Sequence, residues 1–197
     1  MADIDRDELR AVMLAELQGA WTALRQAHPG ERFYSFGVYT APCAEYLMVT
    51  ASTEEGLAAA TERYHAQDGR DRTLRRVSLR WSPCDSPLHE EGQELLTRSD
   101  AIRQSGPDPY DDTEEGEAAV ALAFEVMVEA LQALDRANSF GAGEERQRIV
   151  LGVWMGDQSD EERVEYVRLL NPAAVADSFE REIEAGNRAF DALSVGK

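Results

Sequence analysis

Apolar residues recur every three or four positions in several stretches of the chain, which is typical of helices with one buried face. The segment 113–138 shows this most clearly, because a 4-3-4-3 spacing holds there over four turns and predicts a long helix. The residues in this stripe are Val120, Phe124, Met127, Leu131 and Leu134. The same periodicity, with capping residues in front of it, predicts further helices. They cover residues 6–27, 52–67, 89–98, 159–170 and 171–190.

Other stretches alternate apolar and polar residues and predict strands over 32–40, 45–50, 74–81 and 148–155. In the first of them, Tyr34, Phe36 and Val38 are expected to share one face. In the third, the alternation predicts one buried and one cationic face. In the last, apolar residues occupy both faces, so we expect that strand to lie inside the sheet.

These predicted elements indicate an α+β fold, since the first two strands are joined by a tight turn and helices flank the strands. We expect one domain over residues 1–197, with a mainly antiparallel sheet of about four strands packed with five or six helices. Residues 1–30 are expected to form the N-terminal segment that contains the first helix. Residues 83–112 are poorly patterned and contain a Pro/Gly-rich stretch, so they are predicted to form a mobile acidic loop region.

Composition narrows the classes of function. The chain has 38 acidic and 20 basic residues, a net charge of −18 that argues against binding nucleic acids or anionic membranes. No apolar run approaches the ~20 residues of a membrane span, and the N-terminus has no export signal, so we expect a cytoplasmic protein. Lys197 is the only lysine, and such arginine bias is typical of GC-rich genomes. Part of the composition can therefore reflect the genome.

The acidic charge is concentrated in residues 85–117, which hold eleven acids and two arginines. The candidate binding residues are the carboxylates around the start of the long helix, which would attract a cationic partner. They are Asp111, Asp112, Glu114 and Glu115. The alternative is a solvated loop whose last carboxylates favour the helix N-terminus.

The opposite charge gathers in residues 70–80, with five arginines and one aspartate. Arg76 and Arg80, with Glu54 and Trp81, form a second candidate site, which would bind an anion, an acidic partner or a small substrate. The alternative is that both arginines pair with helix carboxylates and that Trp81 belongs to the core.

Motifs for catalysis or cofactors are missing from the sequence. There is no Gly-x-Ser-x-Gly, no Cys-x-x-Cys and no pair of histidines at zinc-ligand spacing. The acidic run 108–116 lacks the order of a calcium loop, and Phe140 with the following glycines is more simply a helix C-cap. Cys43 and Cys84 are expected to be free, buried thiols. We therefore predict no catalytic residue, metal or cofactor, and an enzyme is the less favoured class.

Four blocks of sequence resemble an uncharacterised bacterial family, domain of unknown function 4303. They are Phe33–Thr40, Ser52–Glu55, Leu79–Pro83, and Phe140–Gly143 followed by Gly156–Asp157 and Leu170–Pro172. The chain departs from the family pattern in two places. Ser52 replaces an asparagine, and Cys84–Ser86 replaces a Glu-Trp pair.

This resemblance implies no established activity. In its context the family is similar to small acidic immunity proteins encoded beside bacterial toxins, which favours protein binding. Our leading hypothesis is a non-catalytic protein-binding domain, an immunity-like or accessory factor whose acidic surface binds a basic protein such as a toxin. The alternatives are a small-ligand binder or enzyme with its site near Arg80 and Glu54, and a homo-oligomer held by an apolar patch.

Overall fold

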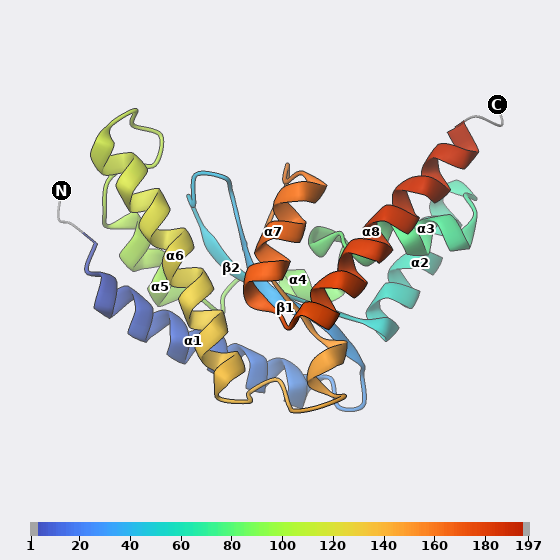
Figure 1. Ribbon diagram of the computed structural model, residues 1–197, viewed down its shortest axis with the longest axis horizontal. Coiled ribbons are helices and arrows are strands. Elements are labelled where there is room, and N and C mark those ends of the chain that lie inside the picture. Colours follow the sequence, from blue (N-terminus) through green and yellow to red (C-terminus); the bar gives the residue numbers. More distant parts are fainter. Residues whose placement is uncertain (1–3, 195–197) are drawn as a thin grey trace.

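A three-stranded sheet forms the centre of the molecule (Figure 1). The computed structural model describes residues 4–194, with side chains for 4–188. Strand β1 (Phe33–Thr40) lies between β2 (Leu47–Thr53), which runs antiparallel to it, and β3 (Val150–Met155), which runs parallel. The α+β class is confirmed. The sheet is mixed and has three strands in the described part of the chain, fewer than the four predicted.

Helices cover both faces of this sheet. Helices α1 and α6 belong to the main core, whereas α2, α3 and α8 surround a second, smaller core on the other face. The two groups lie at opposite ends of the long axis in Figure 1. The helices are α1 (Arg6–Ala27), α2 (Glu54–Asp68), α3 (Arg72–Arg80), α4 (Pro87–Glu91), α5 (Thr97–Gln104), α6 (Glu114–Arg136), α7 (Asp160–Leu170) and α8 (Ala173–Ser194), with 3₁₀ turns η1 (Pro83–Asp85) and η2 (Arg146–Arg148). None of the helices described is long and apolar enough to cross a membrane.

The main core is organised around Trp21 of α1. Its ring centroid lies 5.1 Å from those of Phe33, Phe36 and Phe140, and its indole N–H donates to the carbonyl of Ser139 at 2.8 Å. Phe140 is fully buried, so the turn after α6 packs back on the core as the C-cap interpretation predicts.

The second core depends on two glycines. The indole of Trp154, on β3, lies against the backbone of β1 and β3 at Gly37 and Gly152, where an added Cβ would overlap the carbonyl of Gly152 or the indole itself. Glycine in a strand interior commonly marks such a close approach.

The predicted strand 74–81 is wrong, because this segment lies in helix α3. Asp71 caps the helix by accepting from the backbone N–H of Leu74. Residues four apart share a face in a strand and in a helix alike, so Arg76 and Arg80 fit either periodicity. A run of eight residues does not separate the two.

A β-bulge between Phe33 and Ser35 corrects a second prediction. It places Tyr34 in the second core, while Phe36 and Val38 lie in the main core on the other face. Bulges commonly re-aim a side chain in this way.

Strand β3 is an edge strand, not the interior strand predicted. Its two apolar faces are explained by helices on both sides of the sheet. At its free edge the side chain of Asn171 accepts from the N–H of Leu151 at 2.9 Å and donates to the carbonyl of Leu151 at 2.7 Å. One amide group thus replaces a neighbouring strand at this position.

Residues 83–112 contain η1, α4 and α5, so much of this region is helical and the single helix predicted over 89–98 is replaced by two. The mobility of the region stays a prediction. Cys43 and Cys84 are free, but Cys43 is only half-buried and Cys84 is exposed, contrary to the buried thiols expected.

His89 predicts a dependence of stability on pH. It is buried beside Tyr39, and burial lowers its pKa. An unfolded chain then binds this proton more readily, so stability is highest above the ordinary pKa of about 6.5 and falls below it. We expect the urea midpoint to drop between about pH 7 and pH 5, and to drop less in His89→Gln.

His28 supplies the control with the opposite sign. Its pKa is raised, mainly by a hydrogen bond to Glu91. Its stabilising contribution is full below the ordinary pKa and is lost as the pH rises through the raised value. His28→Gln should therefore lose more stability than wild type on acidification. Parallel responses of the two variants would contradict both assignments.

Candidate functional site

Three residues of the second candidate site, Glu54, Arg80 and Trp81, line a hollow of about 340 Å³, here called the arginine hollow. The fourth, Arg76, joins them through its ion pair with Glu54. Arg80, at the end of α3, donates from Nε to Glu182 of α8 at 2.7 Å and from Nη1 to Glu54 of α2 at 2.8 Å. Arg76 also donates to Glu54. Both arginines thus pair with helix carboxylates, as one of the two interpretations predicted.

Aromatic rings form the base of the arginine hollow. The Arg80 guanidinium lies 4.5 Å from the ring centroid of Tyr34, and the Tyr34 hydroxyl donates to the backbone carbonyl of Arg80 at 2.7 Å. Trp81 is largely buried and packs edge-to-face on Phe179, with centroids 4.8 Å apart. A guanidinium over an aromatic face is attracted by the ring quadrupole.

The ionisation of these groups favours binding over proton transfer. Burial raises the pKa of Tyr34 to about 12, so the phenol stays neutral. Burial by itself lowers the pKa of Arg80, but Glu54 and Glu182 outweigh it and raise the pKa above its ordinary value. A general acid or base needs a pKa near neutral pH, and neither Tyr34 nor Arg80 has one.

Glu54 provides a prediction about this cluster. Its side chain is 21% exposed and accepts from two arginines, so Glu54→Gln removes a shared charge partner. We expect a loss of about 1–3 kcal/mol in the free energy of unfolding, measured by urea denaturation. The control is Glu55→Gln, whose partner Arg32 is 74% exposed. Surface pairs contribute little, so the control should change little, and equal losses would contradict the prediction.

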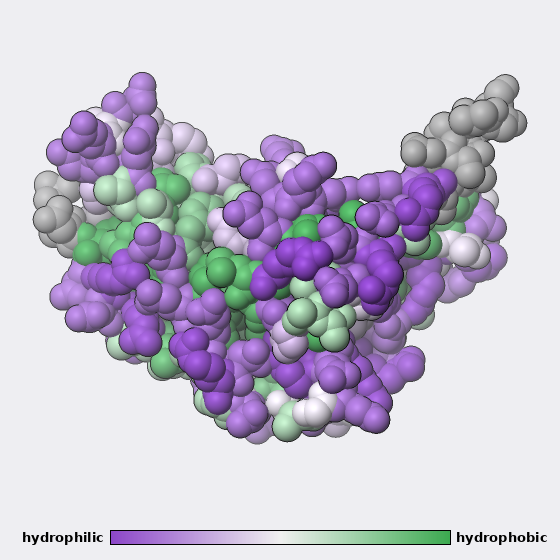
Figure 2. All heavy atoms as spheres, viewed as in Figure 1, coloured by the Kyte–Doolittle hydropathy of each residue, from purple (hydrophilic) through white to green (hydrophobic). Residues whose placement is uncertain are grey.

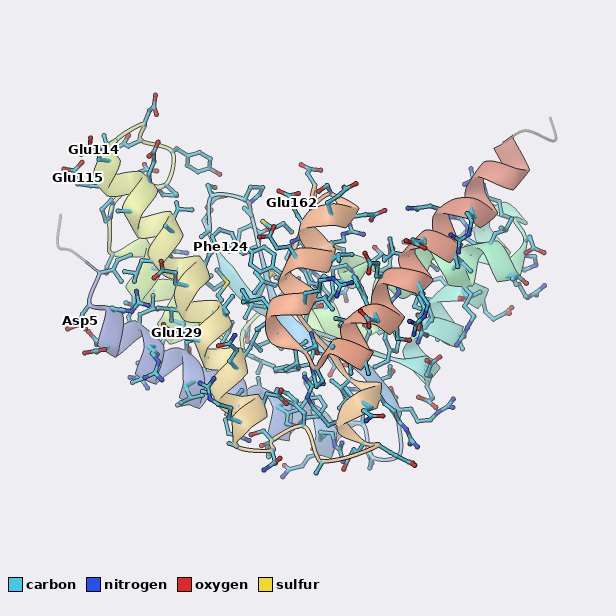
Figure 3. All side chains as sticks on the ribbon, viewed as in Figure 1. Asp5, Glu114, Glu115, Phe124, Glu129 and Glu162 are labelled. Carbon is cyan, nitrogen blue, oxygen red and sulfur yellow. The ribbon has the colours of Figure 1, made fainter. Side chains whose placement is uncertain are left out.

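The acidic candidates gather at the other end of the molecule, in the loop between α5 and α6 and the first turn of α6 (Figure 3). We call these residues, together with Glu117, the acidic tip. Thr113 caps α6 by accepting from the N–H of Gly116. All five carboxylates are exposed, and none forms an ion pair with a basic side chain in residues 4–188. The acidic tip comprises Asp111, Asp112, Glu114, Glu115 and Glu117.

An apolar hollow of about 460 Å³ lies directly beside the acidic tip. It is bordered by Asp111, Asp112 and Glu117, and its other lining residues are mainly apolar. They are Pro42, Cys43, Pro109, Tyr110, Val120 and Ala121. Tyr110 is 67% exposed, the most exposed large hydrophobic residue among those described.

Half-buried apolar residues continue from this hollow along α6. Phe124 and Val128 follow Val120 at helical spacing, and Tyr166 of α7 lies with its ring centroid 6.1 Å from that of Phe124. Figure 2 shows hydrophilic residues over the lobe that carries the acidic tip and hydrophobic residues between α6 and α7. The acidic tip thus borders one end of an apolar surface.

Several residues of the arginine hollow and of the surface at the acidic tip were not predicted from the sequence. Tyr34 was assigned to the wrong face because the bulge carries no clear sequence signal, and Glu182 is separated from Arg80 by 102 positions. Tyr110 lies inside the acidic run 108–116, where only the charged residues were predicted to bind. No group of three or more His, Cys, Asp or Glu side chains in the described residues is placed to hold a metal ion.

Comparison with known proteins gives one match. Residues 14–172 match the family described as Domain of unknown function (DUF4303). No curated protein and no solved structure matches the chain.

Proposed function

The chain belongs to the DUF4303 family, and we propose that it is a non-catalytic protein-binding domain that receives a basic segment of a partner at the acidic tip and the adjoining apolar hollow. One observation carries this proposal. The five exposed carboxylates of the acidic tip have no ion-pair partner among the described residues, and three of them border an apolar hollow that contains an exposed tyrosine.

The acidic tip differs from much of the remaining surface in how its carboxylates are paired. Elsewhere, many carboxylates have a basic partner close by: Arg6 pairs with Glu125 and Glu129, and Arg168 pairs with Asp177 and Glu180. At the acidic tip the negative charge is uncompensated. Clustered charge of one sign steers an oppositely charged protein and disfavours wrong partners.

The apolar hollow can contribute affinity, which clustered charge by itself provides only weakly. Steering by charge mainly raises association rates, whereas affinity depends on a few well-buried anchors, often aromatic, surrounded by polar groups. Tyr110 and Val120 with the neighbouring carboxylates have this composition. A partner segment that carries both basic and apolar side chains fits it best.

The biological role proposed is that of an immunity-like or accessory factor, and the partner a basic protein such as a toxin. The mechanism would be occlusion, since covering a cationic surface needs no catalytic group in this chain. The central sheet with α1 and α6 provides a rigid scaffold for the acidic tip.

The experiment is capture from the source organism with the tagged protein at low and high salt, followed by mass spectrometry. We expect one stoichiometric basic protein that is lost at high salt. Failure to retain any protein, or retention that salt does not affect, would contradict the proposal.

Tyr110 allows a sharper version of this test. Tyr110→Ala should weaken the captured complex roughly fivefold or more, because truncating an aromatic anchor typically costs over about 1 kcal/mol of binding. The matched control is Leu169→Ala, since Leu169, on α7, is the other exposed large hydrophobic residue among those whose side chains are described. Affinities measured by calorimetry should differ for Tyr110→Ala alone. Equal affinity in both variants would exclude Tyr110 as an anchor.

A further inference from the structure

A small cavity of about 10 Å³ lies beside the arginine hollow, close to the space that one water molecule needs. Trp81, which follows directly after α3, and Trp154 of β3 line it together with Arg80. The remaining lining residues are Ser35, Ser52 and Pro83.

Both indoles of this cavity have an unsatisfied donor. Nε1 of Trp81 and Nε1 of Trp154 are buried and have no hydrogen-bond acceptor in the structure. Trp21 is different, because its Nε1 donates to the carbonyl of Ser139. A buried donor without a partner costs about 1–3 kcal/mol, so two of them lining one cavity indicate that an acceptor belongs there.

The chemistry of the lining defines that acceptor. An indole N–H and a guanidinium can only donate, and serine hydroxyls adapt to either role. Glu54 and Glu182 use two of the five N–H groups of Arg80. The site therefore suits an acceptor with negative charge, in a protein whose surface is otherwise strongly acidic.

The volume of the small cavity favours a carboxylate over a phosphate. The cavity admits one atom of water size, which a flat carboxylate can insert, whereas a tetrahedral phosphate is too bulky. Arg80 and Trp81 line both the small cavity and the arginine hollow of about 340 Å³, so the two spaces adjoin each other. Phe179, Tyr34 and Val175 offer the hollow an apolar wall. Pockets of about this volume commonly hold small molecules.

We propose that this site binds a small organic carboxylate. One carboxylate oxygen accepts from the indole N–H groups of Trp81 and Trp154 inside the small cavity. The other faces Arg80, and the apolar part of the molecule lies in the arginine hollow against Phe179. This second binding site lies at the central sheet beside α3 and α8 and is separate from the acidic tip, which lies at the start of α6 (Figure 1).

The three tryptophans make the test internally controlled. Each gives one indole signal in a ¹H–¹⁵N spectrum of the full-length protein, and Trp21 reports on a satisfied donor remote from the site. The probes are sodium acetate, benzoate and phenylacetate, with benzyl alcohol as the neutral match for benzoate. We expect saturable shifts of the Trp81 and Trp154 signals with a carboxylate, at least tenfold weaker binding of benzyl alcohol, and an unmoved Trp21 signal.

A variant distinguishes donation from mere proximity. Trp154→Phe keeps a flat ring over Gly37 and removes the N–H, so it should weaken carboxylate binding tenfold or more while the fold and the Trp21 signal are retained. Arg32→Gln, at the exposed rim of the hollow, is the control and should bind nearly as wild type. The proposal is overturned if no carboxylate shifts the two signals, if all three move together, or if a crystal grown with benzoate shows only a water in the cavity.

Discussion

Replacing Gly37 with alanine is expected to destabilise the fold by more than about 3 kcal/mol, above the usual cost of overpacking. Gly37 lies in the central strand, where a Cβ would overlap the carbonyl oxygen of Gly152 on β3 and lie 3.0 Å from Nε1 of Trp154. Backbone cannot rotate away as a flexible side chain can. The strands would have to separate, or the ladder between β1 and β3 would break.

Gly19 on α1 provides the matched control, because an added Cβ there meets nothing within 4 Å. Gly19→Ala should stabilise the protein by about 0.5–1 kcal/mol, since alanine favours a helix interior over glycine. Urea denaturation of the three proteins measures both effects. A Gly37→Ala protein as stable as wild type would show that β1 and β3 do not pack as described.

Removing the side chain of Asn171 is expected to have the second large effect. Its amide bonds both backbone groups of Leu151, donates to the carbonyl of Val167 at 2.8 Å and accepts from Arg146 at 3.0 Å. Arg146 is itself buried and pairs with Asp135. Asn171→Ala leaves several of these groups unsatisfied, each at about 1–3 kcal/mol.

We therefore expect Asn171→Ala to lose about 3 kcal/mol, which corresponds to a fall in Tm of roughly 6–12 °C for a domain of this size. The measurement is calorimetry, with hydrogen exchange to show that the protection of β3 falls first. Asn187→Ala is the control, because that exposed amide donates only to Asp160 among the described residues. A similar Tm for the two variants would mean that Asn171 does not hold the edge of β3.

Local signals in the sequence predicted local structure well. The Ser159 and Glu162 pair forms the capping box expected at the start of α7, and Asp5 caps α1. In α6, Met127, Leu131 and Leu134 are buried as predicted, while Val120 and Phe124 are half-buried. Long amphipathic helices and their caps depend on nearby residues, so the pattern carries most of the information.

Features that depend on distant contacts were not predictable. The side-chain amide of Asn171 bonds both backbone groups of Leu151 at the edge of β3, a contact that no local pattern in the sequence indicates. The helix at 72–80 is favoured by its Asp71 cap and by the pairing of Arg80 with Glu54 and Glu182, and the second of these partners lies in the last helix. The arginine hollow therefore exists only in the folded chain, whereas the acidic tip is contiguous in sequence and was predicted as a surface.

On this proposal the acidic tip, and not the acidity of the whole protein, recognises the partner. The variant Asp111→Lys, Asp112→Lys, Glu114→Lys, Glu115→Lys reverses the tip. A control places four lysines at Asp7, Glu90, Glu94 and Asp157, which are exposed and form no ion pair among the described residues, so both variants change the net charge equally.

The decisive measurement is the association rate of the captured partner with the three proteins across a salt series. We predict a fall of roughly 10- to 1000-fold for the tip variant at low salt, with little remaining salt dependence. The control should stay close to wild type, with the same steep decline as salt increases. If both variants slow association equally, or neither does, the acidic tip is not the recognition surface.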